Sequence, residues 1–289
     1  MKILVLGGAG MAGHTISIYF KEAGYDVTAF GLEKVDFCIS IIGDATDFKT
    51  LRGIIREGGY DAVINAIGIL NQDAEDHKAI AVLLNSYLPH FLSETTADLK
   101  TRIIHMSTDC VFSGKTGNYS EKSPRDGETF YDRSKALGEL ENDKDLTFRN
   151  SIIGPDRNEK GIGLFNWFMK QEGTIYGYTG AIWTGVTTLA LAKAMERALM
   201  DNLTGLYNLV NNDTISKYEM LKLFNKHMKD NSITVLPDDR ISINKSLVNT
   251  RTDFSFQVPT YDDMIAEMAK WTRQHQELYP HYFNRGHES

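Results

Sequence analysis

The sequence predicts an α/β protein built on a doubly wound parallel sheet. Short apolar runs alternate with amphipathic segments at βαβ spacing through the first third of the chain. A glycine-rich turn follows the first apolar run directly, and the regular alternation stops past residue 150. We therefore expect a Rossmann domain and a smaller mixed α/β C-terminal domain. We expect residues 1–150 to form the Rossmann domain and residues 181–211 to return to it. Residues 151–180 and 212–289 are expected to form the C-terminal domain.

Each expected element of the first domain follows from its apolar pattern. Runs that end in glycine or polar residues predict buried parallel strands, and runs with helical periodicity predict the crossover helices. The expected strands are residues 2–6, 25–30, 61–68 and 101–108, and the expected helices are residues 11–24, 48–59 and 77–98. Right-handed crossovers place the carboxyl ends of these strands at one edge of the sheet, where such folds bind ligands.

The second half of the chain alternates less regularly. The expected helices are residues 163–171, 185–202, 216–229 and 261–275, and the expected strands lie within residues 149–156 and 205–210. The aromatic run at residues 278–282 predicts a docking contact of the chain end, and residues 283–289 predict a frayed end. We therefore expect this half to close over the ligand edge of the sheet.

The composition of the 289 residues is that of an ordinary globular protein, with 42% hydrophobic and 24% charged residues. A net charge of −7 argues against nucleic acid as the main partner. The two cysteines, Cys38 and Cys110, are too few for a disulfide framework, which favours buried thiols in a cytoplasmic protein. The sequence also predicts neither a signal peptide nor a membrane span.

The glycine-rich turn predicts a dinucleotide site. Gly7, Gly10 and Gly13 fit G-x-x-G-x-x-G, while Gly8, Gly10 and Gly13 fit G-x-G-x-x-G. A strand–glycine–helix turn exposes unpaired N–H groups at the positive end of the helix dipole, which suits a pyrophosphate. The alternative is a turn that serves only tight packing. The later spacing of the catalytic residues favours the first pattern.

The adenosine side of this site leaves the choice of nicotinamide open. Gly31 stands at the end of the second strand, where NAD-binding domains place an acid against the ribose hydroxyls. Lys34 lies just beyond, and a lysine there can meet a 2′-phosphate, so the sequence favours NADPH over NADH. Asp44 follows a candidate third strand and can accept a hydrogen bond from the adenine amino group. Asp47 is the better candidate for the N-cap of the next helix.

Tyr131 and Lys135 lie one helical turn apart, on the same face of a predicted helix. This spacing is common in surface helices. However, Thr108 and Ser107 close a strand at the expected ligand edge. A phenol is a weak acid–base group at neutral pH, and a neighbouring ammonium lowers its pKa. We therefore expect Tyr131 to protonate a carbonyl oxygen that it shares with the Thr108 hydroxyl, and Lys135 to hold the nicotinamide ribose.

These motifs together resemble a known family. The chain resembles the extended short-chain dehydrogenases/reductases, and within them the dTDP-4-dehydrorhamnose reductase branch. The segments that carry the resemblance are GGAGMAG, GDATD, INAIG, LNSYLPHFL, STDCVFSGKTGNYSE, YDRSKALGE and FRNSIIGP, in the family's order over residues 1–155. The resemblance implies that Thr108, Tyr131 and Lys135 are catalytic and that Asn85 supports a proton relay. The alternative for Asn85 is a polar residue satisfied within its own helix.

The resemblance also implies contacts with the cofactor and the substrate. A small-residue loop ends the strand near residue 65 and is expected to pass over the cofactor. The further residues expected at the cofactor are Met11, Ala12, Ala45, Asn65, Ala66, Ile67, Gly68 and Ile152. The residues expected at the substrate are Asp109, Asn166, Trp183 and Arg251. We expect no metal, because His14 follows Gly13 where some members carry an acid.

The implied activity is the NAD(P)H-dependent reduction of a keto group on a nucleotide-activated deoxysugar, in polysaccharide biosynthesis. Two alternatives remain. An epimerase or dehydratase of the same superfamily is weakly supported, because Asp109 is followed by Cys110 rather than by an acid. A non-catalytic cofactor-binding subunit would not need the intact set of Thr108, Tyr131 and Lys135. The oligomeric state is left open, with a homodimer as the candidate assembly.

Overall fold

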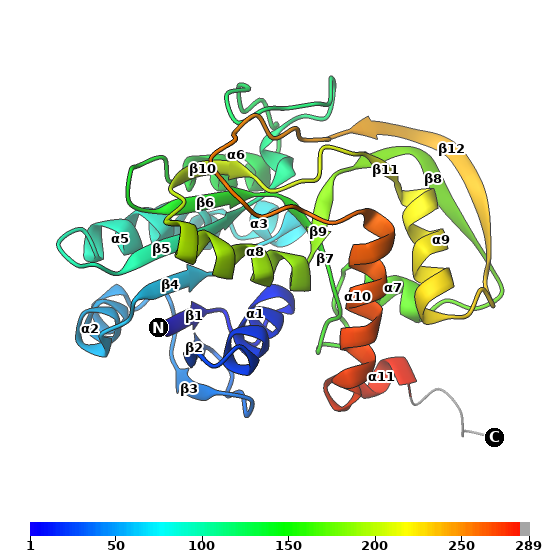
Figure 1. Ribbon diagram of the computed structural model, residues 1–289. Helices are drawn as coiled ribbons and strands as arrows, with labels where there is room; N and C mark the ends of the chain where they lie inside the picture. Colours follow the sequence, from blue (N-terminus) through cyan, green and yellow to red (C-terminus); the bar gives the residue numbers. More distant parts are fainter. Residues whose placement is uncertain (284–289) are drawn as a thin grey trace.

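The computed structural model describes residues 1–283 and contains one large parallel sheet beside a smaller mixed part (Figure 1). The large sheet has seven strands in the order β10-β6-β5-β4-β1-β2-β3, and every neighbouring pair is parallel. Its strands are β1 (Lys2–Leu6), β2 (Asp26–Gly31), β3 (Ile39–Ile42), β4 (Ala62–Asn65), β5 (Arg102–Ser107), β6 (Leu146–Arg149) and β10 (Gly205–Asn208). The predicted doubly wound α/β fold is confirmed.

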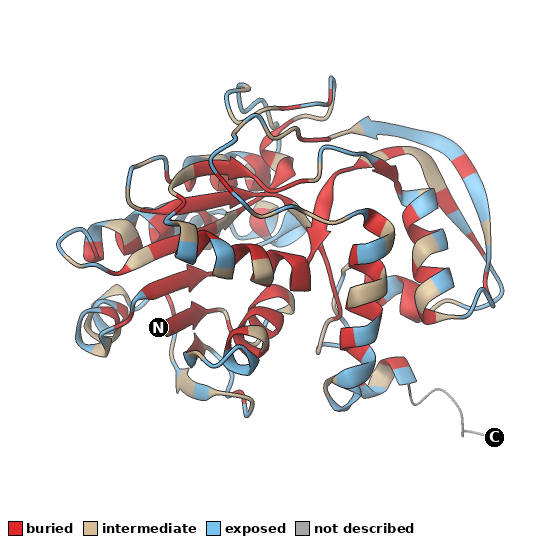
Figure 2. Ribbon diagram, in the orientation of Figure 1, coloured by how far each residue is buried: buried red, intermediate tan, exposed pale blue. Residues whose placement is uncertain are grey.

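Alternate residues of the strands build a separate core on each face of the sheet. In β1, Ile3 and Val5 join one cluster, while Leu4 and Leu6 join the other. The helices α1 (Met11–Glu22) and α8 (Thr188–Asp201) pack together on the first face. The helices α2 (Phe48–Gly58) and α5 (Leu88–Thr95) pack together on the second. The central strands are therefore buried almost throughout (Figure 2).

The smaller part is built on the three-stranded sheet β11-β8-β12. Its strands are β8 (Thr174–Trp183), β11 (Ile215–Ser216) and β12 (Thr234–Asn244), and its helices are α7 (Leu164–Met169), α9 (Lys217–Met228), α10 (Tyr261–Gln274) and α11 (Pro280–Phe283). A two-stranded sheet of β7 (Ser151–Ile153) and β9 (Gly185–Thr187) accompanies it. Strand β12 pairs in parallel with β8, and α9 packs on β8.

Three features of the second half of the chain differ from the expectation. Strands β8 and β12 were not predicted, because glycines interrupt the apolar pattern of β8 while Pro237 and charged residues interrupt that of β12. The single strand expected within residues 149–156 is two strands in different sheets, β6 and β7, with Asn150 between them. The helix expected from residue 185 begins at Thr188, because residues 185–187 form β9.

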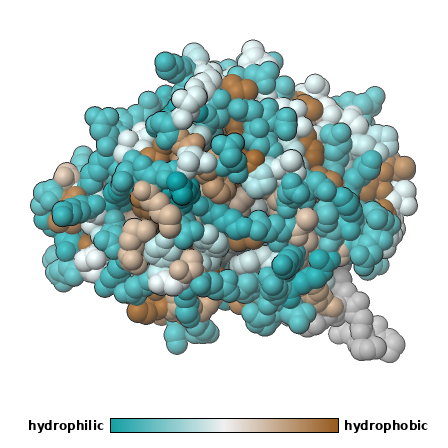
Figure 3. Space-filling model, viewed as in Figure 1, coloured by the Kyte–Doolittle hydropathy of each residue, from teal (hydrophilic) through white to brown (hydrophobic). Residues whose placement is uncertain are grey.

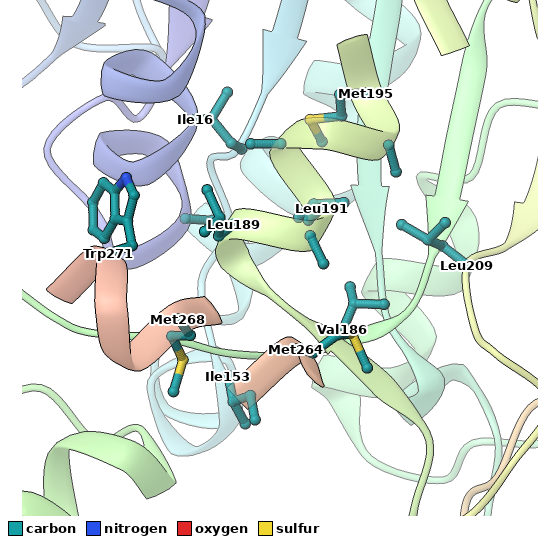
Figure 4. Close-up of a cluster of buried hydrophobic side chains, with 14 of the residues drawn as sticks. Ile16, Ile153, Val186, Leu189, Leu191, Met195, Leu209, Met264, Met268 and Trp271 are labelled. Atoms are coloured by element: carbon teal, nitrogen blue, oxygen red, sulfur yellow. The ribbon is translucent and has the colours of Figure 1, made fainter. Parts of the chain in front are cut away.

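The two parts share one apolar core. Figure 4 shows Ile16 of α1, Leu191 of α8 and Met264 of α10 among the buried side chains of this cluster. Strand β10 pairs with β6 in the large sheet, although it follows β8 and β9 in the chain. The predicted domain limits stay a prediction, but these contacts place α8 and β10 with the first part.

The face in Figure 3 is largely hydrophilic, with small scattered apolar side chains. Within residues 1–283, no helix has both the length and the apolar character that crossing a bilayer requires. The end that we expected to fray, residues 283–289, lies outside the described residues except for Phe283.

Candidate functional site

The turn between β1 and α1 depends on glycine at several positions. Gly7 has a φ of +79°, and its carbonyl oxygen accepts a hydrogen bond from the N–H of Gly10 at 3.0 Å. A Cβ on Gly13 would lie 2.0 Å from that same oxygen, and a Cβ on Gly8 would lie 2.5 Å from the Cβ of Ala29. Gly10 is the N-cap of α1 and has no side chain to occupy the helix end. The turn therefore fits a pyrophosphate.

A cavity of about 450 Å³ opens beside this turn at the carboxyl ends of the strands. Nine residues that were predicted to contact a cofactor line it: Gly7, Gly10, Met11, Gly31, Asp44, Ala45, Ala66, Ile67 and Gly68. The cavity has further lining residues that the sequence did not indicate: Ala9, Phe30, Leu32, Glu33, Gly43, Ile69, Leu84, Asp156 and Asn158. Its size and lining suit a dinucleotide.

Besides Tyr131 and Lys135, five predicted cofactor residues do not line this cavity: Ala12, Gly13, Lys34, Asn65 and Ile152. Gly13 instead lets α1 approach β1. Asn65 is fully buried, and its amide oxygen accepts a hydrogen bond from the Ile67 N–H at 3.2 Å, so it shapes the loop after β4. The Lys34 side chain is 72% exposed and lies 3.8 Å from the carboxylate of Asp36.

The three predicted catalytic residues lie where β5 meets α6 (Phe130–Leu137). Thr108 directly follows β5, and its hydroxyl donates to Asp109 Oδ1 at 3.2 Å while accepting from the Cys110 N–H at 3.1 Å. Tyr131 and Lys135 are both buried on α6. This helix begins with a capping box in which Thr129 and Asp132 satisfy each other's backbone N–H groups. The capping box fixes where the helix starts and therefore the positions of Tyr131 and Lys135 on it.

Burial dominates the electrostatics of this group. It raises the pKa of Tyr131 well above its usual value, an effect that hydrogen bonding with the Thr108 side chain partly offsets. Burial also lowers the pKa of Lys135 to about 8, partly offset by the Glu139 carboxylate. The Lys135 amine donates to the Met106 carbonyl oxygen at 2.7 Å. The expected lowering of the Tyr131 pKa by Lys135 is therefore absent in this structure.

Asn85 lies in a π-helical turn, Val82–Tyr87, which interrupts the helix expected over residues 77–98. Its side-chain amide donates to the Ile69 carbonyl oxygen at 2.9 Å and to Ser134 Oγ at 3.0 Å. Its side-chain oxygen accepts from the Ile69 N–H at 2.8 Å. Asn85 thus fastens the loop after β4 to the helix that carries Tyr131.

The sequence did not predict a buried ion-pair network next to Ser107. The Arg149 guanidinium, fully buried in β6, donates to both carboxylate oxygens of Glu139, at 2.8 and 2.7 Å. The same carboxylate accepts from Ser107 Oγ at 2.6 Å and from Arg125. An arginine at the end of the buried strand β6 was the available sequence signal, because a buried charge requires a partner.

Among the predicted substrate residues, the structure brings only Asp109 into contact with the predicted catalytic residues, through Thr108. Burial raises the pKa of Asp109, and the nearby Lys245 ammonium opposes this rise. Asn166 is buried in α7, where its amide donates to the carbonyl oxygens of residues 158, 159 and 161. Trp183 is buried in the core beside Tyr261.

Arg251 lies at the start of β10, at the opposite edge of the sheet from the cavity. Its guanidinium donates to the carbonyl oxygens of Thr204 and Leu206, at 2.7 and 2.9 Å, and pairs with Asp253. These contacts satisfy part of the free edge of β10. Residues 1–283 contain no group of three or more His, Cys, Asp or Glu side chains that could hold a metal ion.

The glycine turn, the cavity and the Thr108, Tyr131 and Lys135 side chains stand on one edge of a seven-stranded Rossmann sheet. This fold and its homologues define the class of protein, an NAD(P)-dependent oxidoreductase of the extended short-chain dehydrogenase/reductase type. More narrowly, the chain belongs to the family described as the RmlD substrate binding domain, whose model matches residues 1–153.

Individual relatives agree with this family. The dTDP-4-dehydrorhamnose reductase of Burkholderia thailandensis is 32% identical over 225 residues, which cover 72% of each chain. The spore coat polysaccharide biosynthesis protein SpsK of Bacillus subtilis is 25% identical over 224 residues, covering 75% of this chain and 76% of that protein. The fold resembles the dTDP-4-dehydrorhamnose reductase of Bacillus anthracis in complex with NADP, with a TM-score of 0.79, 18% identity and coverage of 94% and 100%.

Proposed function

We propose that this protein reduces a keto group on a nucleotide-activated deoxysugar. This is the reaction indicated by the name of its relatives, dTDP-4-dehydrorhamnose reductase. The observation that carries the proposal is the gathering of Thr108, Tyr131 and Lys135 at the carboxyl edge of the sheet. There they adjoin the dinucleotide-sized cavity through Gly68, where a Cβ would lie 3.9 Å from Lys135 Nζ. The product would enter polysaccharide biosynthesis in the cytoplasm, a role consistent with the name of the Bacillus subtilis relative.

The side chains have complementary roles in this reaction. The reduced nicotinamide, when bound, supplies the hydride for the carbonyl carbon. Tyr131 donates its proton to the carbonyl oxygen, and its raised pKa keeps the phenol protonated at neutral pH. The Thr108 hydroxyl hydrogen-bonds the same oxygen. Lys135 is charged in most molecules at pH 7, so it binds ribose hydroxyls and stabilises the phenolate that remains.

Asn85 and Asp109 support this group in the proposal. Asn85 positions Tyr131 through Ser134, which lies on the same helix. Asp109 accepts the Thr108 hydroxyl proton in this structure, and Thr108 turns that proton to the carbonyl oxygen when the substrate is bound. Lys245, whose charge acts on Asp109, is a candidate cation for the substrate diphosphate, in place of Arg251.

The cofactor is a nicotinamide dinucleotide, and the choice between NADH and NADPH depends on the charged residues around the adenosine ribose. Lys34 favours NADPH, but its side chain is exposed and does not line the cavity. The described lining includes Glu33, Asp44 and Asp156 and no lysine or arginine. A 2′-phosphate is repelled by these carboxylates, whereas a ribose hydroxyl can donate to one of them. The lining therefore favours NADH, and Glu33→Gln should narrow the difference in Kd between NADH and NADPH.

The function is tested with NADH or NADPH and a panel of dTDP- and UDP-linked 4-keto sugars, by following the absorbance of the reduced cofactor. Tyr131→Phe should lower kcat by roughly 10²–10⁴-fold while leaving the Kd of the cofactor nearly unchanged. Turnover that survives in Tyr131→Phe would remove this residue from the mechanism. Binding of cofactor without turnover of any keto sugar would instead favour the non-catalytic subunit.

A further inference from the structure

The chain end makes a buried contact with the glycine turn. His14, in the first turn of α1, is fully buried, and its Nδ1 lies 2.9 Å from the carbonyl oxygen of Gly10. Its Nε2 lies 2.6 Å from the hydroxyl oxygen of Tyr279, which is also fully buried. This hydrogen bond joins residues 265 positions apart in the sequence. The helix α10, which leads to Tyr279, lies beside α1, and Figure 4 shows its Trp271 next to that helix.

The chemistry of this contact fixes the direction of both hydrogen bonds. A carbonyl oxygen only accepts, so His14 Nδ1 carries the proton and donates it to Gly10. Nε2 of the neutral ring is then an acceptor, and the Tyr279 hydroxyl is its donor. Burial lowers the pKa of His14 to about 4, so the ring stays neutral near pH 7. The Gly10 carbonyl thereby selects this tautomer of His14, and the Tyr279 hydroxyl supplies the donor that its Nε2 needs.

A second tyrosine of the same segment contacts another part of the cavity lining. The hydroxyl oxygen of Tyr282 accepts a hydrogen bond from the backbone N–H of Asp156 at 2.9 Å. Asp156 and Asn158 line the cavity together with residues of the glycine turn, and the Asn158 N–H donates to the Asp156 carboxylate at 2.9 Å. The rings of Tyr279 and Tyr282 are stacked, with centroids 5.6 Å apart. One short aromatic segment therefore contacts the supports of two parts of the lining.

We propose that Tyr279 and Tyr282, named here the tyrosine brace, are positioning residues that hold these two parts of the cofactor-cavity lining in place. Tyr279 acts through His14 on Gly10, and Tyr282 acts directly on the backbone at Asp156. Neither tyrosine lines the cavity itself. The brace makes affinity for the dinucleotide depend on how the C-terminal segment is docked. This inference rests on the proposed function only in taking a nicotinamide dinucleotide as the ligand.

The test removes single hydroxyl groups and keeps the rings. Tyr279→Phe and Tyr282→Phe are compared with the control Tyr261→Phe. The Tyr261 hydroxyl donates to the Asp213 carbonyl oxygen at 2.6 Å, and neither residue lines the cavity. The Kd for NADH and NADPH is measured on the full chain by titration of intrinsic fluorescence, and circular dichroism checks that each variant is folded. Each brace variant should weaken binding roughly three- to tenfold, as expected for one lost hydrogen bond, and Tyr261→Phe should not.

A purely structural role would give a different pattern. For a positioning role, the KM of the cofactor rises in the brace variants while the KM of the sugar nucleotide stays at its original value. If both brace variants are folded and bind the dinucleotides as tightly as the unaltered protein does, the brace is overturned and the proposed function stands. If the unaltered protein binds neither dinucleotide, the proposed function itself fails, and the brace fails with it.

Discussion

The glycine turn and the smaller mixed part of this molecule are specified by different kinds of interaction. The turn from Gly7 to Gly13 is set by backbone contacts between residues a few positions apart. In the smaller part, β8 pairs with β12, which begins about fifty residues after β8 ends. The first kind of contact leaves a pattern in the local sequence, and the second leaves almost none. The difference also predicts where substitutions are most damaging.

The largest effect is expected where two backbone segments touch. Gly13→Ala places a Cβ 2.0 Å from the carbonyl oxygen of Gly7, so the helix must move away from the strand. The free energy of unfolding should fall by about 2–3 kcal/mol, as measured by urea denaturation, and dinucleotide binding should be lost.

Gly53→Ala is the matched control for that substitution. Gly53 lies inside α2, and a Cβ there has nothing within 4 Å. Because alanine is the better helix former, this variant should be more stable by about 0.5–1 kcal/mol. Equal destabilisation by the two alanines would mean that the close approach at Gly13 is not what the turn requires.

A smaller effect is expected from pH. The pKa of Lys135 is about 8, so its ammonium loses its proton as the pH rises past that value. Only the charged form stabilises a phenolate at Tyr131, so kcat/KM should fall up to tenfold per pH unit above about 8 and level off below it. The linked effect on folding has the opposite sign. Because the folded pKa lies below the unfolded value, stability from this group is gained between about pH 8 and 10.4.

Lys135→Met provides the control for both measurements. This variant should turn over much more slowly, and its pH–rate profile should no longer fall above about pH 8. The linked change in stability with pH should also flatten. A profile that keeps the same limb in this variant would assign the titration to a different group.

The smallest effect is expected at Arg251, which lies beside β10 of the large sheet. Arg251→Gln removes hydrogen bonds to the carbonyl oxygens of Thr204 and Leu206, so stability should fall by about 1–2 kcal/mol. The KM for the sugar nucleotide should not change, because this residue lies at the far edge of the sheet. A KM that rises several-fold without loss of stability would restore the substrate role that the sequence predicted.

The sequence predicted what depends on short spacing. Tyr131 and Lys135 are one helical turn apart, and the glycine turn is contiguous, so both were found with their elements. Contacts between distant segments were not found: neither the partnership of His14 with Tyr279 nor that of Glu139 with Arg149 leaves a periodic signal. Trp183 shows the reverse error, because an aromatic residue suited to stacking on a base fills the core instead.

The covered edge of β10 limits how copies of this chain can associate. Asn208, at the end of this strand, receives a hydrogen bond from Asn249 at its carbonyl oxygen and donates its N–H to Glu121. With Arg251 on the Leu206 carbonyl, these side chains occupy the backbone groups that an added strand would need. Two copies therefore cannot join their sheets through β10 into one continuous sheet. A homodimer of this protein must instead be formed by another surface, such as its helical faces.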